Sequence, residues 1–572
     1  MALAGTQGTL SLSNGTPVLS GSFSGLDTAA VVEALVQAKS FPIVRLQQKI
    51  SDNEIKSTAY TNLQTLVNNL QSAAEGLRNP PGLNGDLENV FEQKSAFLTS
   101  SSATAAGDIM GVTAANTAIA GIYEFEVQQI ATAHKISGGT IADNTAAMGV
   151  AENLTIGLAG GTTANIAVTA DMTLDSLVSA INSQSDVTGV RASSLKIADG
   201  DFRIVLTAEE TNKAITFTGD AGGALATALG ISADNGATFS NELETPQPAQ
   251  VLVDGIPDPI TRDSNEISDA ITGLTFDLFK AEPGTTVQVE IDPDLTAVRG
   301  RIDAFVTAYN ELRAFSLGQQ QVNTEGEVSA DSVLFGDNTL RTMESALGSD
   351  ISGFTDNLLS GALTTLRDIG IELDSNNYLT VDSSTLDSAL VSKLDEVRDL
   401  FEFSFTADSA KVAMISRSAQ LSVGDFELNI TGTDAGGNIL GVSVTGHGNV
   451  FDIDGSRLVG IEGTAFEGMT LAYAATPSTG AETIQISTSL GFAEKIFQTA
   501  DNYARSDGGL IAEQISTLGG LNEDYTTEIA KIEERMVAYR AFLLEKFAKM
   551  EQAVAFAENM TNQLKSFIES DR

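Results

Sequence analysis

The stretch from Glu523 to Glu569 contains neither proline nor glycine, and no other feature of the chain constrains its fold as strongly. Its apolar residues recur at steps of mostly four and three, which is the heptad spacing of a coiled-coil seam. A continuous helix over this stretch is about 70 Å long, at about 1.5 Å per residue. Such a helix cannot bury its seam in one globular core, so the sequence predicts a partner along its length.

The predicted seam of this C-terminal helix contains one irregularity. Two successive steps of four, from Tyr539 to Leu543 to Phe547, form a stutter, which locally unwinds a supercoil. The seam residues are Tyr525, Ile529, Ile532, Met536, Tyr539, Leu543, Phe547, Met550, Val554, Ala557, Leu564 and Phe567.

A second long helix is predicted near the N-terminus. Asp27 is a candidate N-cap for a short helix from Thr28 to Ser40, which we expect Phe41-Pro42 to break. Pro42 then suits the first turn of a helix that continues to about Arg78. Its seam residues are Ile43, Leu46, Ile50, Asn53, Ser57, Tyr60, Leu63, Val67, Leu70, Ala74 and Leu77. This is the segment whose length and period match the C-terminal helix, and its polar seam positions can fix the register.

Between the two long helices the pattern alternates between strand and helix. The apolar period is two from about 91 to 292, apart from a short helix at 172–182. Helical spacing returns at 295–317, near 331–347 and from Phe492 to Ile515, and a hairpin turn is expected at Asn376-Asn377 before a helix capped by Asp382 or Ser383. Residues 420–488 are again rich in strands and Gly-containing turns.

These patterns predict an α+β multi-domain fold in which the terminal helices form a coiled-coil rod and two β-rich domains are inserted. The predicted parts are a flexible arm and terminal helix (1–42), a rod helix with the N-terminal part of a helical domain (43–115), a β-rich insertion (116–290), a helical and hairpin domain (291–404), a second β-rich insertion (405–490), the C-terminal part of the helical domain (491–524) and the C-terminal coiled-coil helix (525–572).

Composition excludes several classes of function. The net charge of −43 disfavours binding to nucleic acid or to an anionic membrane, because both require basic patches. The chain has no cysteine, and no apolar run approaches the length of a membrane span. Its first basic residue is Lys39, so we expect no basic leader of the Sec type and export without a cleaved Sec signal.

No motif indicates catalysis or a cofactor. We expect His134 and His447, which are far apart in sequence, to be exposed or hydrogen-bonded loop residues rather than a shared metal site. The sequence Asp452-Ile453-Asp454-Gly455 hints at calcium but lacks the further ligands of a calcium loop, so we interpret it as a β-turn. The chain has no Gly-x-x-x-x-Gly-Lys phosphate loop. We therefore predict no catalytic residues, no cofactor and no metal.

Several segments resemble one family, the flagellar filament cap proteins or hook-associated protein 2 family. They are GLDTAAVVEALVQAKSFPIVRLQQK (25–49), GIYEFEVQQIATAHKIS (121–137), TLDSLVSAIN (173–182), LRDIGIELDSNNYLTVDSSTLDSALVSKLDEVRDLFEF (366–403) and KFAKMEQAVAFAENMTNQ (546–563). They occur in the family order. Residues 420–488 depart from the shorter members of the family.

The resemblance implies a structural cap at the distal end of the bacterial flagellar filament that promotes flagellin folding and polymerisation and prevents monomer leakage. It implies a ring, usually a pentamer, with flagellin, hook-filament junction proteins and an export chaperone as partners. The residues expected in the coiled coil or in self-association are Ile43, Leu46, Ile50, Tyr60, Val67, Leu70, Ile529, Ile532, Met536, Tyr539, Leu543, Phe547, Met550, Val554 and Leu564. We expect the rod before Pro42 and beyond Phe547 to meet other chains.

Two alternative functions remain open from the sequence. One is another flagellar axial or junction protein, although the Arg-Leu-Ser-Ser-Gly stretch typical of flagellin ends is missing. The other is a surface adhesin at the flagellar tip that binds a host glycan or surface through its β domains.

Overall fold

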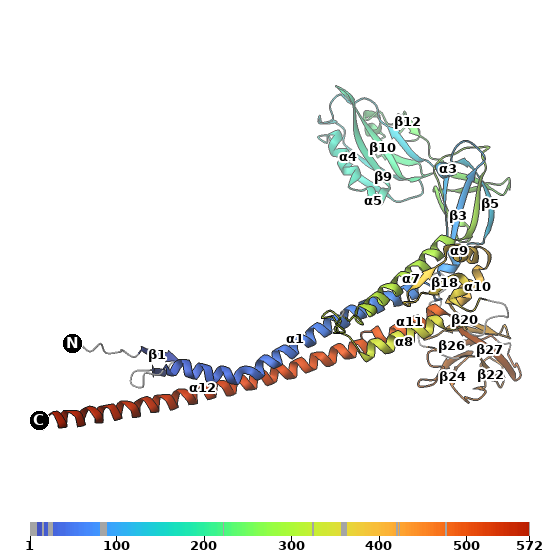
Figure 1. Ribbon diagram of the computed structural model, residues 1–572. Helices are drawn as coiled ribbons and strands as arrows, with labels where there is room; N and C mark the ends of the chain where they lie inside the picture. The colour runs from blue at the N-terminus through green and yellow to red at the C-terminus, as the bar shows by residue number, and fades with distance from the viewer. Residues whose placement is uncertain are drawn as a thin grey trace. The chain divides into compact units, whose positions relative to one another are not determined.

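The structure is a computed structural model, and it describes residues 9–13, 16–20, 27–79, 89–220, 222–322, 325–355, 363–418, 421, 424–474 and 477–570. The contacts divide the chain into two compact units (Figure 1). The rod unit contains residues 1–78, 302–414 and 418–572, and the β unit contains residues 79–301 and 415–417. The predicted α+β multi-domain fold is confirmed.

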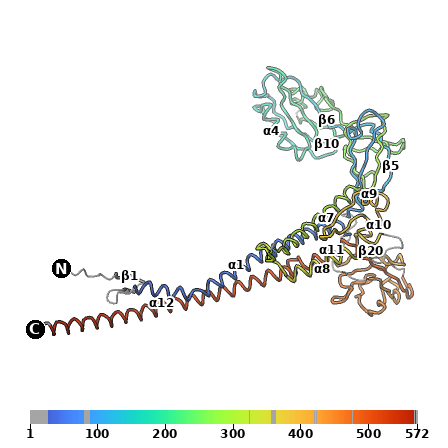
Figure 2. The backbone as a smooth tube through the Cα atoms, viewed as in Figure 1, coloured from blue at the N-terminus to red at the C-terminus, as the bar shows by residue number. Residues whose placement is uncertain are grey.

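Two long antiparallel helices form the rod. They are α1 (Thr28–Glu75) and α12 (Leu510–Ser570), which lie side by side in Figures 1 and 2. Asp27 caps α1 as predicted, because its carboxylate accepts a hydrogen bond of 3.0 Å from the Ala30 amide. The glycine pair Gly519-Gly520 does not interrupt α12, so this helix begins earlier than the glycine-free stretch indicated.

The predicted break at Phe41-Pro42 is wrong, because α1 continues through Pro42. Proline removes one helix hydrogen bond and crowds the preceding turn. Val32 and Ile43, on either side of it, are nevertheless buried, with 1% and 8% of their surface exposed. Packing on both sides of Pro42 therefore offsets the local cost of the proline. The predicted boundary at residue 42 falls inside this helix.

Shorter helices pack around the base of the rod. They are α7 (Leu295–Gly318), α8 (Asn338–Ser352), η2 (Leu366–Ile369), α9 (Ser383–Ser392), α10 (Leu394–Phe401) and α11 (Phe492–Ala504). Asp382 caps α9, and the predicted hairpin is β18 (Ile371–Leu373) with β19 (Leu379–Val381). The helix expected from Phe492 to Ile515 is two helices, since α11 ends at Ala504 and α12 begins at Leu510.

The second β-rich insertion is built of two four-stranded sheets with the orders β20-β27-β22-β23 and β21-β26-β25-β24. Its strands are β20 (Phe403–Ala407), β21 (Val412–Ser416), β22 (Phe426–Ile430), β23 (Val442–Val444), β24 (Phe451–Asp454), β25 (Arg457–Gly460), β26 (Thr470–Tyr473) and β27 (Glu482–Leu490). The insertion starts and ends at one point, because β20 pairs with β27 and the Gly491 amide donates to the Glu402 carbonyl at 2.8 Å.

The β unit contains two apolar cores. One lies between the sheets β14-β13-β5-β17-β3 and β15-β16-β4, and the other among β12-β6-β10-β9, β11-β7-β8 and two short helices. The strands are β3 (Lys94–Ser100), β4 (Met110–Ala114), β5 (Gly121–Gln129), β6 (Ala133–Ser137), β7 (Glu152–Leu158), β8 (Thr163–Val168), β9 (Val190–Ala198), β10 (Asp201–Thr211), β11 (Ile215–Gly219), β12 (Glu242–Glu244), β13 (Ala249–Val253), β14 (Ile260–Arg262), β15 (Glu266–Ile271), β16 (Leu274–Leu278) and β17 (Val287–Pro293). The helices are η1 (Val90–Glu92), α3 (Ala106–Ile109), α4 (Leu174–Asn182), α5 (Ser185–Thr188) and α6 (Ala224–Ala228). The strands thus begin at Lys94, before the predicted boundary at residue 116.

A further hairpin, β1 (Thr9–Ser13) with β2 (Thr16–Ser20), lies in the rod unit, where β2 contacts α12. It falls within the arm for which the sequence predicted flexibility and no strand. Among the described residues, no helix combines the length and apolar character that crossing a membrane requires.

Candidate functional site

The rod surface is the candidate functional site, and the predicted seam residues lie on it at three levels of burial. On α1 the seam is best buried in its C-terminal half, whereas on α12 most seam residues are half-buried and the seam is exposed at Leu564. Ile43, Leu46, Tyr60, Val67, Leu70 and Leu543 are buried; Ile50, Ile529, Ile532, Met536, Tyr539, Phe547, Met550 and Val554 are half-buried; Leu564 is exposed.

Polar contacts across the rod fix how the two helices are aligned. The Asn53 amide donates to the Asn522 side-chain oxygen at 2.8 Å, which places this polar seam residue against α12. Nearer the far end, Arg540 pairs with Glu33. Because a shifted alignment would separate the two asparagines inside the seam, this pair specifies one register.

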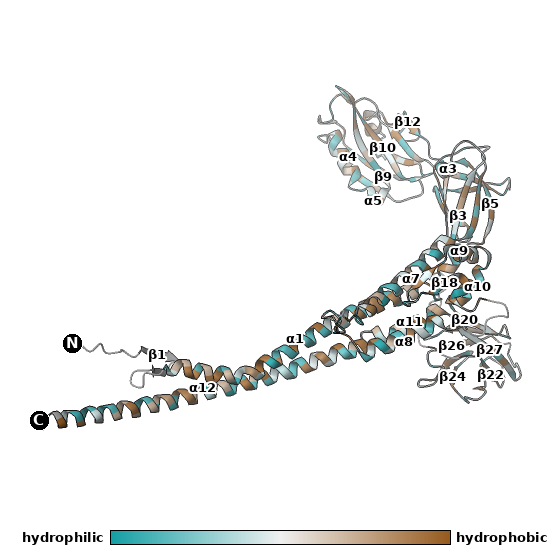
Figure 3. Ribbon diagram, in the orientation of Figure 1, coloured by the Kyte–Doolittle hydropathy of each residue, from teal (hydrophilic) through white to brown (hydrophobic). Residues whose placement is uncertain are grey.

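The end of α12 extends beyond α1. Since Glu33 faces Arg540, the first residue of α1, five positions earlier, faces α12 about five residues after Arg540. Apolar residues continue along α12 past that point (Figure 3). Phe556, Met560, Leu564 and Ile568 follow one another at steps of four and are 67%, 49%, 59% and 66% exposed. We call these four residues the terminal stripe.

Sequence reasoning missed a second set of exposed apolar residues on the rod. Phe41 and Val44 of α1 are 63% and 58% exposed, and Val537 and Phe542 of α12 are 62% and 51% exposed. These residues lie outside the heptad positions, so a search for the seam passes over them. The available signal was their apolar character at positions where a solvated helix face is expected to be polar.

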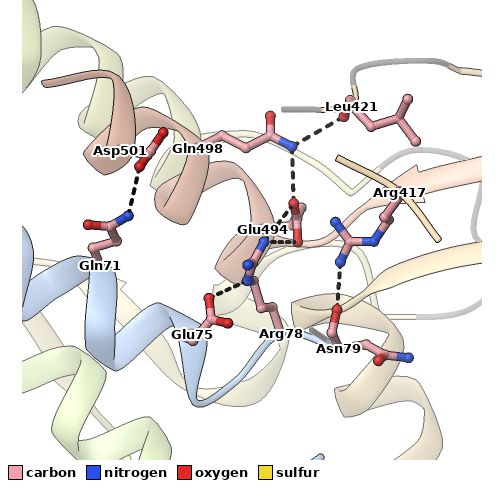
Figure 4. A network of polar contacts seen from close by, with 9 residues as sticks. All are labelled: Gln71, Glu75, Arg78, Asn79, Arg417, Leu421, Glu494, Gln498 and Asp501. Atoms are coloured by element: carbon pink, nitrogen blue, oxygen red, sulfur yellow. Dashed lines mark hydrogen bonds and ion pairs between the residues drawn. The ribbon is translucent and has the colours of Figure 1, made fainter. Parts of the chain in front are cut away.

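A buried ion pair joins the end of α1 to α11 (Figure 4). The Arg78 guanidinium donates from one nitrogen to both oxygens of Glu494 at 3.2 Å and from another to Glu75 at 2.6 Å. It also lies over the Phe497 ring, 3.5 Å from the ring centroid. The Arg78 and Glu494 side chains are 3% and 0% exposed, so the pair exists in a site where a lone charge would be costly.

Two amides extend this network. Gln498 donates to Glu494 at 3.1 Å and to the Leu421 carbonyl at 3.2 Å, and Gln71 donates to Asp501 at 3.1 Å. Figure 4 also shows the Arg417 guanidinium donating to the Asn79 carbonyl, a contact of 2.6 Å within the β unit. Sequence reasoning did not find this network, although Glu494, which directly follows the apolar pair Phe492-Ala493, was an available signal.

A second polar cluster attaches α8 to α1. The Tyr60 hydroxyl donates to Asp337 at 2.6 Å, and Lys56 lies 3.2 Å from the same carboxylate. Asp337 also caps α8 by accepting from the Leu340 amide. Burial and this hydrogen bond raise the pKa of Tyr60, so it remains a donor. Although burial opposes ionisation of Asp337, the bonds from Tyr60 and Leu340 keep its pKa below the ordinary value.

The structure shows where the histidines and the acidic motif that were considered as metal ligands lie. His134 is not an exposed loop residue, because it lies in β6 with 1% of its surface exposed, whereas His447 is exposed in a turn. Asp452, Ile453 and Asp454 lie in strand β24 and only Gly455 lies in the turn to β25, so the β-turn interpretation holds only for the end of this motif. In the part of the chain that the structure describes, no three His, Asp or Glu residues are grouped to hold a metal ion.

Comparison with known proteins gives three family matches along the chain. Residues 247–559 match the model of the C-terminal part of flagellar hook-associated protein 2, and residues 24–134 match that of its N-terminal part. Residues 153–210 match the flagellin hook IN motif.

The chain is also similar to individual proteins. The A-type flagellar hook-associated protein 2 of Pseudomonas aeruginosa is 26% identical over 415 residues, which cover 68% of this chain and 81% of that protein. Flagellar hook-associated protein 2 of Escherichia coli K12 is 27% identical over 379 residues, covering 64% and 76%. The crystal structure of the D1–D3 domains of the Escherichia coli flagellar cap protein, 27% identical, aligns with a TM-score of 0.47 over 60% of this chain and 90% of that chain.

Proposed function

Because the chain belongs to the flagellar hook-associated protein 2 family, it is a filament cap protein, and we propose that the far end of its rod anchors it in the filament. The cap closes the distal end of the bacterial flagellar filament, promotes flagellin folding and polymerisation and prevents monomers from leaking away. The family match favours this function over a junction protein or a tip adhesin.

The terminal stripe is the observation that supports the anchoring proposal. An isolated amphipathic helix is marginally stable in water, because burial of its apolar face supplies most of its stability. Full burial of an apolar side chain of this size contributes about 1.5–3 kcal/mol. Insertion of the stripe among flagellin subunits, or against a neighbouring cap subunit, would therefore stabilise both the helix and the complex.

The remaining partners are proposed from the family function. The protein forms a ring of identical copies, usually a pentamer in this family, whose subunits contact flagellin. Hook-filament junction proteins and an export chaperone are proposed as further partners, and the tip of the extracellular filament as the location. A host glycan or surface is a possible ligand only of the alternative adhesin function. The function is structural and requires no bond chemistry.

A pair of matched variants tests the anchor. Met560→Glu with Leu564→Glu places two charges in the terminal stripe, and Asn562→Glu with Ser566→Glu adds the same charges on the opposite side of α12. We expect the first variant to release flagellin into the medium and to reduce swimming, and the second to behave as the parent does. Flagellin in the culture supernatant is the measurement.

Both variants should fold equally well, because the substituted side chains of the stripe are already exposed. Circular dichroism and thermal melting of the purified proteins check this. Normal retention of flagellin by the Met560→Glu, Leu564→Glu variant would show that the stripe is not the anchor.

A further inference from the structure

A groove crosses the rod unit between α7, α8 and the β18–β19 hairpin. It consists of a hollow of about 550 Å³ and an adjoining one of about 280 Å³, which share Ser352 and Leu373 in their walls. The larger hollow is within the size range of sites that bind a compact ligand or an inserted side-chain cluster. The seam residues lie on α1 and α12 and none of them lines the groove, so the groove is separate from the terminal stripe.

The groove has an apolar floor with polar groups above it. Leu312, Met343 and Leu347 are buried in the floor. Above them, Arg313 donates to Glu344 at 2.5 Å, and its other nitrogen donates to the Asn376 carbonyl at 2.9 Å. These contacts hold the walls in place, so the groove is formed before anything binds.

Two polar groups of the groove have unused binding capacity. Ser316 lines it with 1% of its surface exposed, and its hydroxyl has no hydrogen-bond partner among the described residues. Arg341 donates to the Asn338 side chain at 2.7 Å, but no carboxylate in the described part of the chain lies within ion-pair distance. A buried hydroxyl and an exposed cation favour an occupant that carries hydrogen-bonding groups and negative charge.

A second copy of this chain has the required chemistry. The chain carries 75 acidic and 32 basic residues, so its own surface is a source of carboxylates. The corner between α9 and α10 has an apolar tip, since Val391 is 74% exposed, the highest value among the large exposed apolar side chains of the described residues. Beside it, Asp395 is 85% exposed, and its ion pair with Arg398 at 3.2 Å is on the surface, where such pairs contribute little.

We propose that the groove of one copy receives the α9–α10 corner of the next copy in the ring. Val391 enters above the apolar floor, and Asp395 pairs with Arg341. The corner does not line the groove of its own copy, so groove and corner are two different surfaces. Contacts between two different surfaces repeat head to tail and close into a ring when the rotation allows it. This inference rests on the proposed ring and identifies its subunit contact.

Charge exchange tests the contact on the purified full-length protein. Arg341→Glu alone and Asp395→Arg alone should each weaken ring formation at least about tenfold, because each places like charges together. The double variant Arg341→Glu, Asp395→Arg restores opposite charges at every contact and should recover rings. Lys531→Glu, the same charge change on the exposed side of α12, is the control. Sedimentation velocity and negative-stain images measure the rings.

A second variant blocks the groove without changing its charge. Gly348 lines it, and a Cβ added there would meet nothing within 4 Å, so Gly348→Phe places a ring in the groove. It should also favour the helix, because glycine is a poor helix former. We expect this variant to melt no lower than the parent and to remain monomeric.

Each other outcome contradicts the proposal. Wild-type rings formed by Arg341→Glu, or by Gly348→Phe, would show that the groove is not the contact. Loss of rings without rescue in the double variant would exclude the corner as the occupant. Intact rings combined with weaker flagellin retention would identify flagellin as the occupant. Because the ring measurements on purified protein involve no filament, failure of the proposed contact is distinct from failure of the anchor, which the terminal stripe variants test.

Discussion

At the scale of single residues, His134 links the stability of the β unit to pH. Its Nδ1 accepts the Ile215 amide at 2.8 Å, and its Nε2 lies 2.9 Å from a Glu242 carboxylate oxygen. The ring is therefore neutral, with its proton on Nε2. Burial lowers the pKa of His134, although Glu242 opposes this shift. A second proton could be added only at Nδ1, which would remove the bond from Ile215.

The sign of the pH effect follows from this shift. The unfolded chain takes up the proton near the ordinary pKa of about 6.5, above the folded-state value. Stability from neutral His134 is thus fully present above about pH 6.5 and is lost as the pH falls toward the folded-state pKa. We expect His134→Gln, whose side-chain oxygen can accept the bond from the Ile215 amide, to flatten the change in melting temperature between about pH 8 and about pH 5.5. His447→Gln, at an exposed site, is the control, and an identical slope in all three proteins would contradict the prediction.

Arg78 and Glu494 should be strongly coupled. Arg78→Met removes the cation that faces a fully buried carboxylate, and breaking such a pair costs about 3–5 kcal/mol. The double variant Arg78→Met, Glu494→Leu leaves no unmatched charge and should lose clearly less stability than Arg78→Met alone. Denaturant unfolding of the four proteins of this double-mutant cycle measures the coupling. Additive losses would show that the two side chains do not stabilise one another.

At the scale of elements, the neck of the second insertion depends on one glycine. A Cβ on Gly491 would lie 2.2 Å from the carbonyl carbon of Phe401 and 2.4 Å from the carbonyl oxygen of Glu402, both backbone atoms that cannot move aside cheaply. Gly491→Ala should therefore separate β20 from β27 where the insertion joins the helices, and it should lower the melting temperature. Gly480→Ala, where a Cβ meets nothing within 4 Å, should leave it unchanged. Equal melting temperatures would mean that the neck adjusts without cost.

Helices and strands were predicted well where one periodic pattern dominates. The two long seams, α4, α7 and the β18–β19 hairpin all follow from local spacing and turn residues. The error at Pro42 arose because burial on both sides of a proline can outweigh its local preference, and sequence spacing does not reveal that burial. The same reason explains Gly519-Gly520, which reduce helix propensity without ending α12.

Contacts between distant segments were not predictable in the same way. Tyr60 meets Asp337 across 277 positions, and Arg78 meets Glu494 across 416. A heptad pattern shows which face of a helix is buried, but it does not show which polar side chain lies opposite. The groove and the α9–α10 corner depend on several such placements, so the sequence alone indicated neither.

At the scale of the whole chain, the nested order of segments was the most useful prediction. Pairing α1 with α12 follows from their matching length and period, and everything between them must then leave from and return to the same helical unit. The resemblance of both ends to one family supported the same order, and the family matches now extend over most of the chain.

The net charge of −43 is also a property of the whole chain. It disfavours contact between copies, because like charges repel, except where cations such as Arg341 are exposed.

The alignment of α1 with α12 also bears on when the rod can form. Asn53 and Asn522, which meet inside the seam, are 469 positions apart, so the rod has a very high contact order. Closing so long a loop is slow, because the contacts that stabilise the rod form only after the chain has lost its loop-closure entropy. The domains between the two helices can fold first on local contacts. In contrast, α1 can pair only after α12, which is the last helix in the sequence, is present. A chain that ends before Leu510 would contain folded β domains, but α1 would lack α12, the helix with which it pairs. The paired rod, and with it the proposed anchor, can therefore form only in a chain that includes α12.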